Sequence, residues 1–242
     1  METLPVEIGQ ASSEDTRSEQ ERNGARFERA LMLETRERVR GVMHQVAARI
    51  APGMVEEEAV ALMRRSLKEA DMLRGWHGIH VRFGRNTLKN FGEPSEPGVV
   101  LGEDDIFFID IGPVWRGHEG DAGDTFVVGN DPQMHRAAQD VRAVFEATQA
   151  RWHEDALSGA ELYRFAEAEA ARRGWQLNLD MPGHRLSDFP HALKHDGALL
   201  EADYVPSDGL WVLEIQIRHP DRPFSAFYED LLLSTPTARS IP

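Results

Sequence analysis

The sequence predicts an α+β domain made of two similar halves, each running through two helices, a strand and a β-hairpin. Apolar residues recur at helical spacing in two consecutive pairs of segments. Each pair is followed by two strand-like apolar runs separated by a turn that contains Gly or Pro. The tripeptide Arg74-Gly75-Trp76 recurs as Arg173-Gly174-Trp175 at the matching point of the second half. The period is too long for a solenoid, so the repeat indicates two halves of one domain.

Composition excludes several classes of protein. The net charge of −14 disfavours nucleic acid and anionic membrane surfaces as partners. The chain has no cysteine, which excludes disulfides, thiolate catalysis and cysteine-ligated metal sites. The amino terminus lacks a basic region followed by an apolar one, so neither a signal peptide nor a membrane anchor is expected. The expected location is the cytoplasm.

The first half follows a polar segment, residues 1–24, which is predicted to be a flexible or loosely packed arm. The domain itself is assigned to residues 25–242. Its predicted elements are helices at 25–50 and 56–70, a strand at 79–83 and a loop at 84–98. A hairpin at 106–128 completes this half, with its turn near Trp115 and Arg116.

The second half repeats this order. Its predicted elements are helices at 134–153 and 160–173, a strand through Leu177 and Leu179, and a hairpin of strands 210–217 and 226–233 around a turn at 219–223. Trp175 and Trp211 are interpreted as core residues. Asp124 falls on the opposite face of its strand from Asp121 and is interpreted as half of a structural salt bridge.

Each hairpin carries two acidic residues on one face. Asp110 and Asp121 are predicted to lie across from each other in the first hairpin, and Glu214 and Glu229 in the second. A buried carboxylate without a partner is strongly unfavourable. Any one of these acids is as readily a salt bridge as a ligand, but four converging around a pseudo-two-fold axis predict a metal site. Oxygen ligands suit Mn, Fe, Co or Mg, and two divalent ions would balance the four charges.

One neutral imidazole would complete such a site. The best candidate is His184, which follows Gly183 in a loop and precedes His191 by seven residues. A lone loop histidine is more often a surface residue than a ligand.

The order of these residues resembles the pita-bread metallohydrolases of peptidase family M24, which include methionine aminopeptidase, prolidase and creatinase. The resemblance rests on the five residues and on the motifs Asp-Ile-Gly-Pro (110–113), Gly-X-X-Gly-Asp (117–121) and Thr-Phe-Val-Val-Gly (125–129), and it covers residues 25–235. It implies a pita-bread fold, with both halves around a curved antiparallel sheet, and a dinuclear metal centre of Mn, Co, Fe or Zn.

The resemblance also implies roles for single residues. Asp110 would bind one metal ion, His184 and Glu214 the other, and Asp121 and Glu229 would bridge the two. A water between the ions would act as nucleophile. The catalytic residues would be Glu214, which handles the proton of that water, and His191, which contacts the reacting carbonyl of the substrate.

The expected substrate site departs from the family pattern. The peptidases have a substrate-contacting histidine upstream of the first aspartate, whereas this chain has Phe91 in its place. His77 or His80 could substitute for it in space, although both are interpreted as ordinary strand or loop residues. Arg218 could bind a substrate carboxylate or form a rim ion pair. The strand after Glu214 also lacks the family's usual proline.

The sequence therefore predicts a metal-dependent hydrolase acting on a short peptide or an amino-acid derivative, with an aminopeptidase or Xaa-Pro peptidase as the nearest named activity. The first alternative is a non-peptidase enzyme on the same centre, a creatinase-like hydrolase or a lyase, which Phe91 favours. The second is a catalytically inactive binding module, against which the intact ligand set argues. A homodimer is left open.

Overall fold

The computed structural model describes residues 19–191 and 197–234 and contains both predicted halves. The main elements of the first half are α2 (Arg29–Ala47), α3 (Glu56–Glu69), β1 (Gly75–Phe83), β2 (Asp105–Trp115), β3 (His118–Glu119) and β4 (Ala122–Val128). Those of the second half are α4 (Pro132–Asp155), α5 (Gly159–Arg172), β5 (Gln176–Leu177), β6 (His184–Arg185), β7 (Trp211–Arg218) and β8 (Ser225–Leu231). Short 3₁₀ helices occupy Gly84–Leu88 and Leu199–Glu201.

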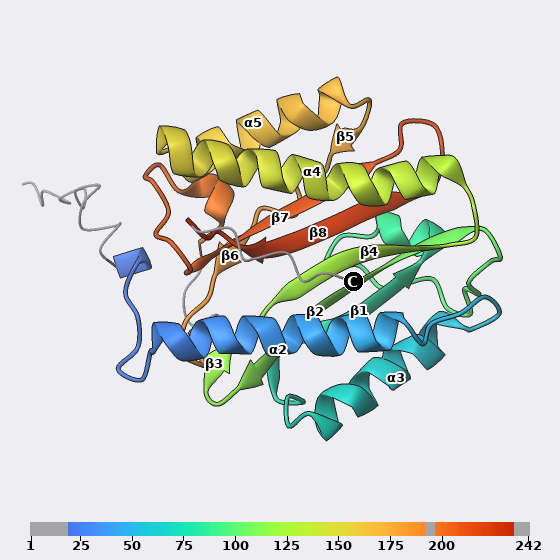
Figure 1. Ribbon diagram of the computed structural model, residues 1–242, viewed down its shortest axis with the longest axis horizontal. Helices are drawn as coiled ribbons and strands as arrows, with labels where there is room; N and C mark the ends of the chain where they lie inside the picture. Colours follow the sequence, from blue (N-terminus) through green and yellow to red (C-terminus); the bar gives the residue numbers. More distant parts are fainter. Residues whose placement is uncertain (1–18, 192–196, 235–242) are drawn as a thin grey trace, which may run out of the picture.

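The strands form one sheet with the order β1-β2-β4-β8-β7-β5, while β3 pairs with β2 and β6 pairs with β7. Every pairing between these strands is antiparallel. The halves meet where β4 pairs with β8, so the order of strands is symmetric about this seam (Figure 1). The predicted α+β fold of two pseudo-symmetric halves is confirmed.

The two faces of the sheet differ in chemistry because side chains alternate along each strand. In β2, Phe107, Ile109 and Ile111 belong to an apolar cluster with residues of α2 and α3. In β7, Leu213 and Ile215 pack with residues of α4 and α5. Helices α2 to α5 thus cover one face of the sheet (Figure 1). The intervening residues, which include the acids of the hairpins, face the other side.

Two local differences from the predicted elements matter for the site. Strand β1 begins at Gly75, four residues before the predicted start at Ile79, so it includes Trp76 and His77. The predicted loop around His184 contains the two-residue strand β6, which pairs with β7. Both elements owe their position to pairing with residues distant in the sequence.

The described end of the predicted polar arm is tied to the domain. The Arg185 guanidinium donates hydrogen bonds to the Glu21 carbonyl and to Asn23 Oδ1, both at 2.8 Å. The Trp211 indole donates to Glu21 Oε1 at 3.0 Å. Residues 1–18 of the arm and 235–242 of the domain lie outside the described residues. Among the described helices, none is both long and apolar enough to cross a membrane.

Candidate metal centre

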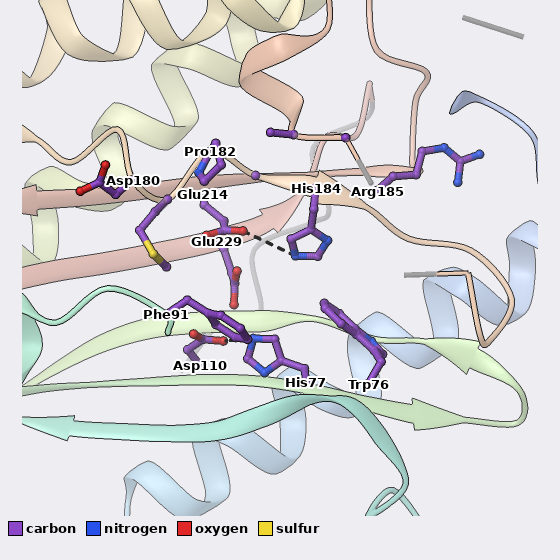
Figure 2. A pocket seen from close by; sticks show the side chains of 14 residues that line it. Trp76, His77, Phe91, Asp110, Asp180, Pro182, His184, Arg185, Glu214 and Glu229 are labelled. Atoms are coloured by element: carbon purple, nitrogen blue, oxygen red, sulfur yellow. Dashed lines mark ion pairs between the residues drawn. The ribbon is translucent and has the colours of Figure 1, made fainter. Parts of the chain in front are cut away.

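A cavity of about 380 Å³ opens on the face of the sheet that the helices leave uncovered. Four of the five predicted ligands line it: Asp110 from β2, His184 from β6, Glu214 from β7 and Glu229 from β8. Figure 2 shows these side chains pointing toward one another. The remaining lining residues are Trp76, His77, Phe91, Asp180, Met181, Pro182, Gly183, Arg185, Gly197 and Ala198.

The registers of the two hairpins explain how the acids converge. Glu214 lies directly opposite Glu229, as predicted. Asp110 pairs with Gly123 rather than with Asp121, which immediately precedes β4. Asp121 is therefore diagonal to Asp110 on the same face, because positions two residues apart share a face. The first hairpin turns at Arg116-Gly117, where Trp115 pairs with His118, as expected.

A glycine at the seam leaves room for the acids. Gly123 of β4 pairs with Glu229 of β8. A Cβ atom on Gly123 would lie 2.4 Å from Phe227 Cε1 and 2.8 Å from Glu229 Oε1. The absence of a side chain at this position is what allows the Glu229 carboxylate to lie against β4.

His184 joins the acids from the other side. Its Nε2 atom is 2.7 Å from Asp121 Oδ2 and 3.5 Å from Glu214 Oε1. Strand β6 fixes this position because His184 pairs with Val212, two residues before Glu214 on β7. Ligand atoms of Asp121, His184 and Glu229 all lie within 4.8 Å of one another, close enough to bind a common ion.

The polar atoms of this cluster fit a metal ion better than a closed network of hydrogen bonds. Within the described part of the chain, several buried side-chain atoms make no hydrogen bond of regular geometry: Asp110 Oδ1, both carboxylate oxygens of Asp121, Glu229 Oε1 and His184 Nδ1. Asp110, Asp121 and Glu229 are each at most 3% exposed. Buried oxygens without donors are costly, and a divalent cation would satisfy them.

Burial and mutual repulsion shift the pKa values of these acids. Burial raises the pKa of Glu214 to about 7, with the charges of Asp121 and Asp110 adding to the effect of burial and His184 opposing it. The pKa of Glu229 is raised well above its usual value by burial and by the charges of Asp121 and Asp110. Like charges this close cannot all ionise without a cation. The electrostatics therefore agree with the geometry.

His77, which the sequence interpretation treated as an ordinary strand or loop residue, lies in this cluster. Its Nε2 atom is 3.1 Å from Asp110 Oδ1, and its side chain is only 5% exposed. Burial lowers the pKa of His77, but the neighbouring Asp110 carboxylate outweighs burial and raises that pKa to about 9. Trp76 packs between the two imidazoles, with ring centroids 5.0 Å from His77 and 4.9 Å from His184.

A bulge in β1 explains why the sequence pattern missed His77. Between the pairs Gly75–Pro113 and Ile79–Ile111, β1 has three residues opposite the single residue Gly112. In a regular strand His77 and His80, three residues apart, would face opposite sides. A bulge re-aims side chains, and it cannot be read from apolar alternation. The presence of two histidines upstream of Asp110 was the available signal.

Of the three predicted substrate contacts, the structure places one at the cavity and two away from it. Phe91 lines the cavity, and its ring lies 4.7 Å from that of His77. His191 does not line this cavity; it borders a separate one beside residues 22–26 and lies near Arg185. Arg218 does not line the cavity either, because its guanidinium donates to the Leu88 carbonyl and to Asn90 Oδ1.

Other interpretations of single residues agree with the structure. Asp124 lies on the helix-covered face, where it pairs with Arg142 at 2.8 Å and with Arg40 at 3.9 Å. Trp175 and Trp211 are both buried in the apolar cluster under α4 and α5. These residues stabilise the halves that carry the centre.

Comparison with known proteins places this arrangement in a family. The family model of metallopeptidase family M24 matches residues 30–235. A search of curated proteins gave no match. Among solved structures, the chain is similar to a prolidase from Pyrococcus furiosus, with 16% identity, a TM-score of 0.67, and coverage of 90% of this chain and 64% of that one. It is also similar to an Xaa-Pro dipeptidase from Bacillus anthracis, with 15% identity, a TM-score of 0.68, and coverage of 92% and 64%.

A methionine aminopeptidase from Thermotoga maritima is 19% identical, with a TM-score of 0.60, and the match covers 79% of this chain and 90% of that one. These likenesses confirm the pita-bread fold, and the chain spans less than two thirds of the prolidase and of the dipeptidase. The match to the family model extends over both hairpins and all five predicted ligands. The chain belongs to metallopeptidase family M24.

Proposed function

We propose that this protein is a hydrolase that uses two divalent metal ions held by Asp110, Asp121, His184, Glu214 and Glu229. The observation that carries the proposal is the convergence of buried carboxylate oxygens that lack hydrogen bonds on one cavity. A catalytically inactive binding module would gain nothing from keeping four such acids together, since burying them without a cation opposes folding.

Charge supports two ions rather than one. Four carboxylates carry four negative charges, which two divalent ions neutralise. The donors are mostly carboxylate oxygens with imidazole nitrogen added, a set suited to Mn, Co, Fe or Zn. Asp110 would hold one ion, His184 and Glu214 would hold the other, and Asp121 and Glu229 would be shared by both.

The bound ions would acidify a water molecule and polarise the bond to be cleaved. Glu214 would take the proton of that water and return it to the leaving group, a role supported by its projection from β7 into the cavity (Figure 2). Trp76, Phe91 and Met181 form an apolar wall that would exclude bulk water from the reacting atoms.

The cavity volume suits a small substrate. About 380 Å³ accommodates a dipeptide or an amino-acid derivative rather than a folded protein segment. The similar structures include a prolidase and an Xaa-Pro dipeptidase, which supports an aminoacyl-proline dipeptide as the first substrate to test.

The second candidate is a non-peptidase reaction on the same centre, a creatinase-like hydrolysis or an elimination. It is favoured by the place of His191 outside the cavity and by Phe91 within it. A peptide carbonyl would therefore lack imidazole contacts from the two positions at which the family resemblance implies them for peptidases.

The test is a substrate screen with protein loaded separately with Mn(II), Co(II), Fe(II) or Zn(II). The panel comprises aminoacyl-proline dipeptides, other dipeptides, amino-acid amides and small guanidino or sulfonium compounds. The control is Asp121→Asn assayed in parallel. Any turnover that this variant shares with the wild type is attributed to a contaminant. Turnover of a peptide by the wild type alone supports the peptidase, and turnover confined to the small compounds supports the second candidate. Failure to bind any metal would exclude both.

A further inference from the structure

We propose that His77 is a sixth protein ligand of the metal centre, bound through Nε2 to the ion that Asp110 holds. The inference rests on the proposed function, because it requires the metal ions of that proposal. It adds a sixth ligand to the five predicted ones. With it, each ion would carry one imidazole, from His77 on β1 and from His184 on β6.

The first argument is the position of the ring. His77 Nε2 is 3.1 Å from Asp110 Oδ1, an oxygen that makes no hydrogen bond of regular geometry. His184 Nε2 is likewise 2.7 Å from Asp121 Oδ2, which also makes no hydrogen bond of regular geometry. The two aspartates are neighbours on one hairpin, whereas the histidines approach them from β1 and β6, and Figure 2 shows the His77 and His184 rings on opposite sides of the cavity. The equivalence of the pairs supports equivalent roles.

The second argument is the tautomer. His77 Nδ1 is 2.5 Å from the Gly78 carbonyl, which can only accept a hydrogen bond. Nδ1 therefore carries a proton, and in the neutral ring Nε2 presents a lone pair toward Asp110. Metal-binding histidines usually have this arrangement, with one nitrogen donating to a carbonyl and the other facing the ion.

The third argument is the way the backbone makes room for the ring. The bulge in β1 places three residues opposite Gly112. A Cβ atom on Gly112 would lie 2.5 Å from His77 Cβ and 2.8 Å from His77 Cγ. Bulges often re-aim a side chain beside an active site. Here the bulge and the glycine together turn His77 into the cavity.

His80 lies in the same cluster but is not expected to bind. Ligand atoms of His77, His80 and Asp110 lie within 4.8 Å of one another. However, His80 Nδ1 is 3.4 Å from the Arg82 guanidinium, which can only donate. The positive charge of Arg82 beside this ring disfavours a cation bound to it. His80 is thus a matched control on the same strand.

The experiment is proton NMR of Co(II)-loaded protein, in which the N–H of a cobalt-bound imidazole gives a strongly shifted signal that disappears in D₂O. The wild type should show two such signals, one from each histidine. His77→Asn should show one, and His80→Asn should still show two. Titration with Co(II) should show one of the two ions bound at least about tenfold more weakly in His77→Asn, a loss no smaller than that of a ligand's supporting group.

The possible failures are distinguishable. A wild type that binds two Co(II) ions but gives a single shifted N–H signal would contradict the assignment of His77 as a ligand without contradicting the proposed function. A wild type that binds no Co(II) would overturn both. Circular dichroism of each variant in chelator would reveal a folding defect, and His77→Gln is a second substitution in case His77→Asn does not fold. The number of shifted signals in the wild type decides the proposal even if neither variant folds.

Discussion

Gly123 of β4 lies opposite Glu229 of β8, at the seam where the two halves of the sheet meet beside the metal centre. The contact predicts that Gly123→Ala is destabilising, because the new Cβ would lie 2.4 Å from Phe227 Cε1. Overpacking of this kind costs about 1–3 kcal/mol. It would also displace the Glu229 carboxylate, so metal affinity should fall.

Denaturant unfolding in chelator and metal titration would measure the two effects of Gly123→Ala. Gly41→Ala is the control, since a Cβ there meets no atom within 4 Å, and alanine in a helix is favoured over glycine. Equal stability and metal affinity of Gly123→Ala and the wild type would contradict the prediction.

Asp121→Asn is expected to remove both ions, because the proposal places this residue between them. Metal content after dialysis, measured by elemental analysis, should fall from about two ions per chain to near zero. Asp180→Asn is the control, since Asp180 is an exposed residue at the rim of the same cavity. If Asp121→Asn kept its metal, the bridging role would be wrong.

Metal removal should lower thermal stability, since the buried acids repel one another without a cation. At a metal concentration of about 100 Kd, binding to the folded state adds about 2.7 kcal/mol. For a domain of this size that corresponds to a rise in Tm of about 5–10 °C. Calorimetry with and without chelator measures the shift, and an unchanged Tm at saturating metal would contradict binding to the folded protein.

Asp131 should stabilise the protein in a pH-dependent manner. Its carboxylate caps α4 by accepting from the Gln133 and Met134 N–H groups, and it pairs with Arg222 at 2.7 Å. The hydrogen bond from Arg222 lowers the pKa of Asp131 to about 2. Because this pKa is lower than in the unfolded chain, the contribution is complete above the unfolded value, near 4, and is lost as pH falls toward 2.

Asp131→Ala should therefore cost about 1–2 kcal/mol at neutral pH, as expected for loss of a helix cap. The difference from the wild type should stay constant down to about pH 4.5 and shrink below it. Urea unfolding at pH 3 to 7 measures the profile. Asp221→Ala, an exposed position in the neighbouring turn, is the control and should change stability by less than about 0.5 kcal/mol.

Arg218→Ala should raise KM and leave metal content unchanged. Arg218 donates hydrogen bonds to Leu88 and Asn90 in the segment before Phe91. Without these bonds the segment that carries Phe91 into the cavity lining would be held less firmly. The sequence hypothesis of a direct contact with a substrate carboxylate makes a different prediction. An effect confined to substrates with a free carboxylate would support the direct contact, whereas an equal effect on amide substrates would support the positioning role.

The sequence predicted the two halves and their hairpins because apolar alternation and turn residues act over a few neighbours. Asp110, Glu214 and Glu229 were located for the same reason, since each lies in a long regular strand whose hairpin partner is close in sequence. His184 was reached by its resemblance to a known pattern, although its element, β6, was not predicted.

The tertiary structure decided what His77, His191 and Arg218 contact. His77 reaches Asp110 through a bulge in β1, and bulges arise from pairing between strands rather than from the pattern of one strand. His191 lies beside residues 22–26, and Arg218 binds the segment before Phe91. These contacts join residues more than 100 positions apart along the chain. The sequence by itself thus determined the architecture and predicted five ligands for it, whereas the positions of His77, His191 and Arg218 relative to the cavity depended on tertiary packing that local patterns do not encode.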